Sequence, residues 1–143
     1  MKSVFADAWY WIALANPRDQ WHEAAKAMGR KLGTSHLITT DEVLVEVLAF
    51  FAEYVADMRK AAVRLVRAVL ANPNVTVIPQ TRDSFLRGIR LYESRLDKEF
   101  SLTDCISMET MRERNLHEVL THDHHFAQEG FAVLFTDESA RTT

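Results

Sequence analysis

The stretch Ser101–Phe126, SLTDCISMETMRERNLHEVLTHDHHF, combines an amphipathic helical segment, a short apolar strand and a turn rich in histidine. Asp104 lies at the start of the predicted helix, and Asp123 directly follows the predicted strand at residues 119–121. Only one helix–strand unit separates these two carboxylates, so both can reach the same place in a fold. The rest of the chain decides which other groups join them there.

Composition indicates an ordinary globular domain. The chain has 143 residues, of which 48% are hydrophobic and 26% are charged, so we expect one domain with a substantial core. The single cysteine, Cys105, excludes an internal disulfide. No apolar run reaches the roughly 18–20 residues that cross a bilayer. Since no signal-like segment opens the sequence, a cytoplasmic protein without a membrane partner is expected.

Charge is distributed unevenly along the chain. Residues 59–98 contain nine basic and three acidic side chains, a net charge of +6 within a chain whose formal net charge is −3. Such a segment is a candidate footprint for a polyanion, and it also fits a solvated helix face. On charge alone, the solvated face is the favoured interpretation.

Short apolar strands alternate with helices from one end of the chain to the other. Strands are expected at residues 2–6, 35–39, 75–78, 119–121 and 131–135. This alternation predicts an α/β domain, a three-layer sandwich whose mainly parallel sheet of about five short strands carries helices on both faces. We assign residues 1–136 to the domain and residues 137–143 to a polar tail. The aromatic run Trp9-Tyr10-Trp11 is interpreted as core rather than as a surface for stacking bases.

Acidic residues follow the strands at the edge where parallel sheets place their functional crevice, the carboxyl ends of the strands. Asp7 follows the first strand, Glu46 lies in the helix after the second, and Asp104 and Asp123 come from the stretch quoted above. Glu46 is the most informative of them, because its sequence neighbours are almost all apolar. A buried carboxylate without a partner is so costly that a cation or a proton should accompany it.

Several of these acids also have structural explanations. Asp7 can simply end a strand, Asp123 can belong to a turn, and Asp104 can occupy the third position of a helix capped by Ser101. Glu42 is assigned a local role, in a capping box with Thr39. No comparable role is available to Glu46.

A cluster of carboxylates predicts a hard divalent cation. Like charges raise one another's pKa values, and a cation relieves that strain. Oxygen ligands favour Mg²⁺, or Mn²⁺ as a substitute, over zinc. Two such ions, roughly 3.5–4 Å apart, can activate water for phosphodiester hydrolysis, which suits a nuclease. His122, His124 and His125 are interpreted as neighbours of this site, although a His-Asp pair also occurs in all-helical metal-dependent phosphohydrolases.

The chain resembles the PIN-domain ribonucleases, in particular the VapC-type toxins of prokaryotic toxin–antitoxin pairs. The matching pieces are VFADAWYWIALANPRDQWHEAA (residues 4–25), ITTDEVLVEVLAFF (38–51), DKEFSLTDCISMETMRERNL (97–116) and VLTHDHHFAQEGFAVL (119–134). The resemblance implies that Asp7, Glu46, Asp104 and Asp123 form an acidic quartet that binds Mg²⁺. It further implies an endoribonuclease toxin that cleaves RNA, often tRNA or ribosomal RNA, usually as a homodimer blocked by a cognate antitoxin.

One position departs from the family pattern. Family members usually have Ser or Thr after the first aspartate, where this chain has Ala8. The missing hydroxyl favours an alternative, a non-catalytic PIN-like module that binds RNA or protein. Thr103 and Thr121 remain as hydroxyl groups that could serve the site instead.

Overall fold

Strand β1 (Ser3–Ala6) lies at the centre of the sheet in the computed structural model, which describes residues 2–137. Within these residues the sheet has five strands, in the order β3-β2-β1-β4-β5, and every neighbouring pair is parallel. The other strands are β2 (His36–Thr40), β3 (Val75–Ile78), β4 (Glu118–Leu120) and β5 (Ala132–Val133). The predicted α/β fold with a parallel sheet is therefore confirmed.

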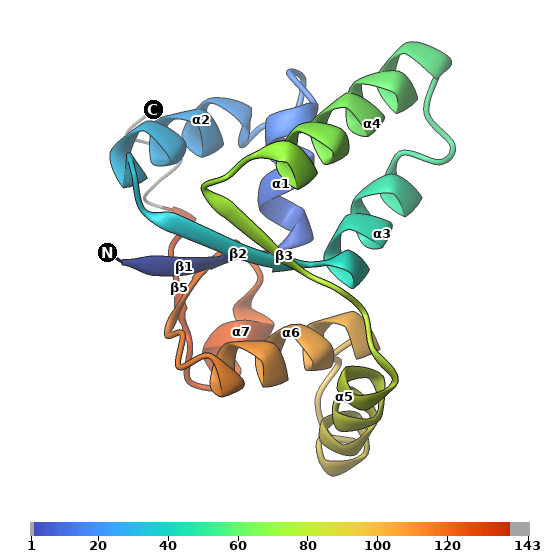
Figure 1. Ribbon diagram of the computed structural model, residues 1–143, viewed down its shortest axis with the longest axis vertical. Helices are drawn as coiled ribbons and strands as arrows, with labels where there is room; N and C mark the ends of the chain where they lie inside the picture. Colours follow the sequence, from blue (N-terminus) through green and yellow to red (C-terminus); the bar gives the residue numbers. More distant parts are fainter. Residues whose placement is uncertain (1, 138–143) are drawn as a thin grey trace.

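Helices cover both faces of this sheet (Figure 1). One layer consists of α1 (Ala8–Ala15), α2 (His22–Leu32), α3 (Asp41–Phe50) and α4 (Ala56–Ala71); the other consists of α5 (Arg82–Ser94), α6 (Leu102–Glu113) and α7 (His124–Gln128). Because both faces are covered, the central strand is apolar on both sides, and Val4, Phe5 and Ala6 have no exposed surface. Among residues 2–137, no helix is long and apolar enough to span a membrane.

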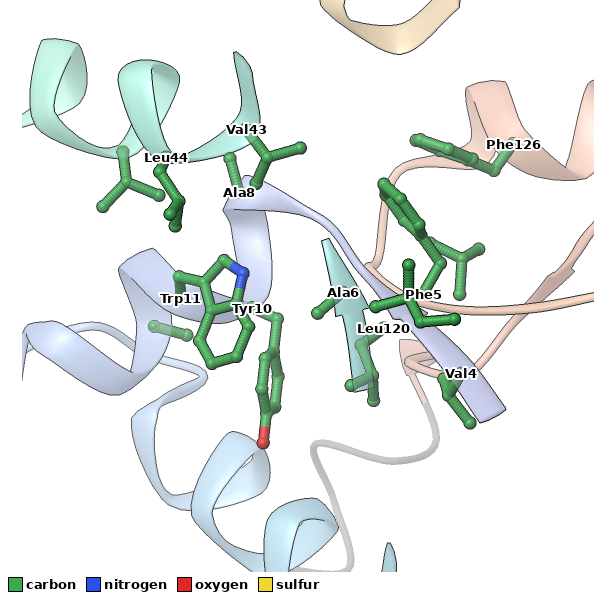
Figure 2. Close-up of a cluster of buried hydrophobic side chains, with 14 of the residues drawn as sticks. Val4, Phe5, Ala6, Ala8, Tyr10, Trp11, Val43, Leu44, Leu120 and Phe126 are labelled. Atoms are coloured by element: carbon green, nitrogen blue, oxygen red, sulfur yellow. The ribbon is translucent and has the colours of Figure 1, made fainter. Parts of the chain in front are cut away.

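The core joins the two layers through the central strand (Figure 2). Tyr10 and Trp11 of α1 are 3% and 4% exposed, so their assignment to the core is correct. Figure 2 places Trp11 beside α3, and Phe126 of α7 on the opposite side of β1. The indole N–H of Trp11 donates to the hydroxyl of Thr39 (3.4 Å), and that hydroxyl donates to the carbonyl of Ala6 (2.8 Å).

The start of α3 differs from the sequence-based expectation by one residue. Thr39 was predicted to cap this helix in a capping box with Glu42, but Thr39 is fully buried in β2, opposite Val77. Thr40 is the cap instead, and its hydroxyl accepts the amide of Val43 at 3.1 Å. Pairing with β3 extends β2 to Thr40, so the helix begins one residue later. The predicted capping box of Thr39 and Glu42 is therefore wrong.

Other helix and strand boundaries also differ from the sequence-based expectation. The turn expected after Asp123 contains the short helix α7, and the strand expected at residues 131–135 is limited to Ala132–Val133. Helix α2 begins at His22 rather than directly after Pro17, because the side chain of Asp19 accepts the amide of Trp21 and holds a turn. Residues 138–143 of the predicted polar tail lie outside the described residues.

Helix α5 packs closely on α6 through Gly88. A Cβ atom at Gly88 would lie 2.5 Å from Cγ1 of Ile106 and 3.3 Å from Cδ1 of Leu102. Ile106 is 4% exposed and cannot move into solvent. The absence of a side chain at residue 88 therefore sets how near α5 approaches the helix that carries Asp104.

We expect Gly88→Ala to destabilise the protein, although alanine favours a helix interior by about 0.8–1.0 kcal/mol over glycine. Overpacking of a filled core costs about 1–3 kcal/mol, so a net loss in the free energy of unfolding should appear in chemical denaturation. Gly29→Ala in α2 is the matched control, because its Cβ would meet only the hydroxyl end of Tyr10, at 3.1 Å. A Gly88→Ala protein as stable as the control would contradict this packing.

Candidate metal centre

The sheet topology brings the four predicted acids to one edge. Asp7 directly follows β1 and Asp123 lies just beyond β4, and these two strands are neighbours. Helix α3, which follows β2, carries Glu46, and the first turn of α6 carries Asp104. Figure 1 shows the starts of α3 and α6 at the carboxyl edge of the sheet. The charges of the four side chains shift one another's pKa values, so the side chains form one cluster.

Asp7 is the most deeply buried of these acids, with 5% of its surface exposed. Burial raises the pKa of Asp7 from 3.8 to about 7, and repulsion by Asp104 and then Glu46 adds to the rise. The hydroxyl of Thr121 donates to Oδ2 of Asp7 at 2.9 Å and partly offsets this effect. Thr121 is thus one of the two hydroxyls expected near the site, and it contacts the first acid directly.

Glu46 is half-buried and faces the other acids. Burial raises the pKa of Glu46 to about 7, and repulsion by Asp104 and Asp123 contributes. Its Oε2 atom is buried and has no hydrogen-bond partner in the described part of the chain. Within residues 2–137 no arginine pairs with this side chain, and the charged groups that act on it are the carboxylates of Asp104 and Asp123.

Asp104 has a structural role as well as a place in the cluster. Its Oδ2 accepts the amide of Ser101 at 3.1 Å, and the hydroxyl of Ser101 accepts the amide of Asp104 at 3.0 Å, which is a capping box. The same side chain is 7% exposed, and burial, together with repulsion by Asp123, raises its pKa. The cap therefore orients a carboxylate that is also part of the cluster.

Asp123 caps α7, and its Oδ1 accepts the amide of His125 at 2.9 Å. The amide of Asp123 in turn donates to the hydroxyl of Thr121 at 3.1 Å. One hydroxyl therefore contacts both strand-end acids, since it donates to the side chain of Asp7 and accepts from the backbone of Asp123.

His125 belongs to the cluster, a position that the sequence-based interpretation of the histidines did not distinguish. Its Nδ1 lies 3.2 Å from Oδ1 of Asp123 and 3.5 Å from Oδ2 of Asp104, and the ligand atoms of these three residues lie within 4.8 Å of one another. His124 is exposed and His122 packs against tryptophans. Only recognition of α7 would have singled out His125, because the first turn of that helix directs its ring inward.

One cavity is lined by the sequence neighbour of Asp104, and another is lined by Asp123 itself. The first, of about 610 Å³, lies between α3, α5 and α6 and is lined by Glu42, Arg82, Phe85 and Thr103 among others. The second, of about 500 Å³, is lined by Trp9, His122 and Asp123 and by residues in and after β5. The second cavity therefore reaches the cluster at Asp123, whereas none of the four acids lines the first.

Comparison with known proteins identifies the fold. The model of the PIN domain family matches residues 4–131. The VapC20 toxin of Mycobacterium tuberculosis, described as cleaving the sarcin–ricin loop, is similar in structure with a TM-score of 0.81 and 24% identity, over 90% of this chain and 96% of that one. FitAcB of Neisseria gonorrhoeae has a TM-score of 0.65 and 17% identity, over 92% of this chain and 96% of that one. No curated protein matches by sequence.

The match to the PIN family runs from β1 to the residue before β5, and it includes all the acids of the cluster and both helical layers. The two solved structures agree with it in fold. The resemblance inferred from the four sequence pieces is therefore confirmed at the level of the family. This chain belongs to the PIN domain family.

Proposed function

We propose that this protein is a metal-dependent endoribonuclease, the toxin of a toxin–antitoxin pair, with Asp7, Glu46, Asp104 and Asp123 as its metal ligands and catalytic residues. The observation that carries this proposal is the buried Oε2 of Glu46, which has no hydrogen-bond partner in the described residues and lies among other carboxylates. Such an arrangement is unfavourable unless a cation or protons occupy it.

The donor set fits Mg²⁺. The four proposed ligands are carboxylates, the hard oxygen donors that Mg²⁺ and Mn²⁺ prefer. One histidine, His125, lies beside them, and a zinc site would be expected to use more histidine or cysteine. A bound Mg²⁺ supplies charge stabilisation at the scissile phosphate and lowers the pKa of the attacking water. The protein's own contribution is to orient the carboxylates, Asp7 through the hydroxyl of Thr121 and Asp104 through the amide of Ser101.

Asp7 has a hydroxyl hydrogen-bond partner even though Ala8 follows it. Ala8 is 2% exposed and packs in the core, whereas the hydroxyl contact to Asp7 comes from Thr121 on the neighbouring strand end. This arrangement supports a catalytic protein over the alternative, a PIN-like module that has lost turnover. The alternative predicts a protein that binds RNA or protein and cleaves no RNA.

RNA is the substrate class that the charges favour, and ribosomal or transfer RNA is the type we propose. Within the basic segment, Arg87 and Arg95 are engaged in ion pairs with carboxylates. By contrast, α4 exposes four cations that have no ion pair in the described part of the chain: Arg59, Lys60, Arg64 and Arg67. Cations that are not neutralised locally attract a phosphate backbone.

The biological setting follows from the resemblance and from the solved neighbour described as a toxin. We propose that the protein acts in the cytoplasm on cellular RNA, that it forms a homodimer, and that a cognate antitoxin blocks its acidic site. A reading frame for a small DNA-binding protein beside this one in the genome would support the toxin assignment.

We expect Asp104→Asn to reduce Mg²⁺-dependent RNA cleavage by at least about a hundredfold, because an amide is a poor ligand for a hard cation. The measurement is cleavage of ribosomal and transfer RNA with Mg²⁺, with Mn²⁺ and with a chelator. The matched control is Asp57→Asn, at an exposed position in the first turn of α4, which should cleave like the wild type. Cleavage that persists in Asp104→Asn, or that survives the chelator, would overturn the metal mechanism.

The ion-free protein should lose stability as pH rises. Asp7 and Glu46 have pKa values near 7 in the folded protein, against ordinary values of 3.8 and 4.5. Between those limits the folded chain binds more protons than the unfolded chain, so the free energy of unfolding falls from about pH 4 towards pH 7 and above. Thermal unfolding in chelator across this range measures the effect.

Added Mg²⁺ should reverse this loss at neutral pH, because a ligand that binds only the folded chain stabilises it. Asp7→Asn should flatten the pH dependence, and Asp57→Asn should leave it unchanged. If the chelated protein becomes more stable between pH 5 and pH 8, or if Mg²⁺ changes nothing, the cluster does not bind a cation as proposed. This measurement does not depend on finding the substrate.

A further inference from the structure

Trp9 differs from the other aromatic residues of its run. Tyr10 and Trp11 are almost completely buried, whereas Trp9 is only partly buried and its ring contacts three other rings. The indole of Trp9 lies 4.7 Å from Phe135, 5.3 Å from Trp21 and 6.1 Å from His122, measured between ring centroids. The core holds this indole in place while part of it remains accessible.

The accessible part of Trp9 lines the cavity of about 500 Å³ beside the acidic cluster. Cavities of about 300–1,000 Å³ with apolar walls and a few polar groups are typical of small-ligand sites. Its apolar wall includes Trp9 and Phe135, and its polar groups include His122, His124 and Asp137. The planes of Trp9 and His122 are inclined by only 27°, so two rings border the cavity in similar orientation.

The polar groups of this cavity are suited to a neutral, flat ligand rather than to an anion. Asp137 is exposed, and its Oδ1 lies 3.0 Å from Nε2 of His122, within hydrogen-bond distance. Asp123 contributes a second carboxylate. Carboxylates repel phosphate and acidic peptides, but they accept hydrogen bonds from the exocyclic amino groups of bases. Aromatic rings provide the stacking surface that bases need.

The cavity adjoins the proposed reaction centre. Asp123 lines the cavity and also belongs to the acidic cluster, and Trp9 follows Asp7 by two residues. An RNA strand whose phosphate lies at the acids therefore carries its neighbouring base to the mouth of this cavity.

We propose that this cavity, the Trp9 pocket, binds one base of the RNA strand next to the phosphate at the acidic cluster, and that it selects a base with an exocyclic amino group. The inference rests on the proposed nuclease function and adds a determinant of sequence preference to it. Trp9 and His122 provide the stacking surface, and the carboxylate of Asp137, which lines the pocket and is not a proposed metal ligand, accepts from the amino group.

The test is a titration of the ¹⁵N-labelled protein, in chelator, with adenosine, guanosine, cytidine and uridine, followed through the indole N–H signals. The chain contains three tryptophans, and the signal of Trp9 is the one absent from Trp9→Phe. We expect the signal of Trp9 to shift saturably with at least one amino-bearing nucleoside and less with uridine. The signal of Trp11 should stay fixed, because its N–H is buried against Thr39.

Matched variants separate the pocket from general effects. His122→Ala should weaken the apparent affinity by about fivefold or more, as expected for loss of a stacking ring. His117→Ala is the control, because His117 is exposed and lies before β4, at the opposite edge of the sheet. Trp9→Leu should abolish binding in a protein that still folds by circular dichroism. If this variant does not fold, the comparison of the two histidine variants decides.

The outcomes distinguish this inference from the proposed function. No shift of the Trp9 signal with any nucleoside, tightest binding of uridine, or equal effects of His122→Ala and His117→Ala would overturn the Trp9 pocket. Because nucleosides lack the phosphate and chelator removes the ion, the titration needs no cleavage. If the protein binds bases but cleaves no RNA, the Trp9 pocket is supported and the nuclease function is refuted. If the protein cleaves RNA but binds no base, the nuclease function is supported and the Trp9 pocket is refuted.

Discussion

The parallel pairing of β1 with β4 is the constraint on which the candidate site depends. Phe5 lies opposite Val119 and Ala6 opposite Leu120, so the two strands end side by side. The amide of Asp7 continues the ladder to the carbonyl of Leu120. A slip of one residue would turn the buried side chains of β1 towards the wrong layer, and both faces of this strand are fully buried. The register, and with it the spacing of Asp7 and Asp123, is therefore strongly determined.

Thr121 converts this pairing into a defined site. Its hydroxyl links the side chain of Asp7 to the backbone of Asp123, across the two strand ends. On the side of α6, the capping box of Ser101 fixes Asp104 in a similar way. Two ordinary local motifs, a hydroxyl at a strand end and a helix cap, thus hold carboxylates that repel one another. The fold tolerates this repulsion because the apolar core on either side of β1 stabilises the arrangement.

Several groups that violate the usual rules of burial lie in this cluster. The raised pKa values of Asp7 and Glu46 and the unpartnered Oε2 of Glu46 all occur at the same edge of the sheet. Local violations of this kind are expected at functional sites, where stability is exchanged for chemistry. The neighbouring Trp9 pocket differs in character, because its rings are well packed and only its rim is polar. The two together suit a ligand with a charged backbone and flat side groups.

The amino-acid sequence by itself determined the α/β class, the parallel sheet and the positions of the four acids relative to the strands. These features follow from local periodicity and from the rule that parallel strands end at a common edge. Membership of the PIN family was also recognisable from four short pieces of sequence. The role of the acids as metal ligands stays a prediction.

Only the tertiary structure decided which neighbours those acids have. The cap of α3 moved from Thr39 to Thr40 because pairing with β3 extended β2, an effect of a strand nearly forty residues away. His125 joined the cluster because α7 turns its ring inward, and Trp9 was separated from Tyr10 and Trp11 because the rings around it leave one side open. These outcomes depend on contacts between distant segments, which no local pattern encodes.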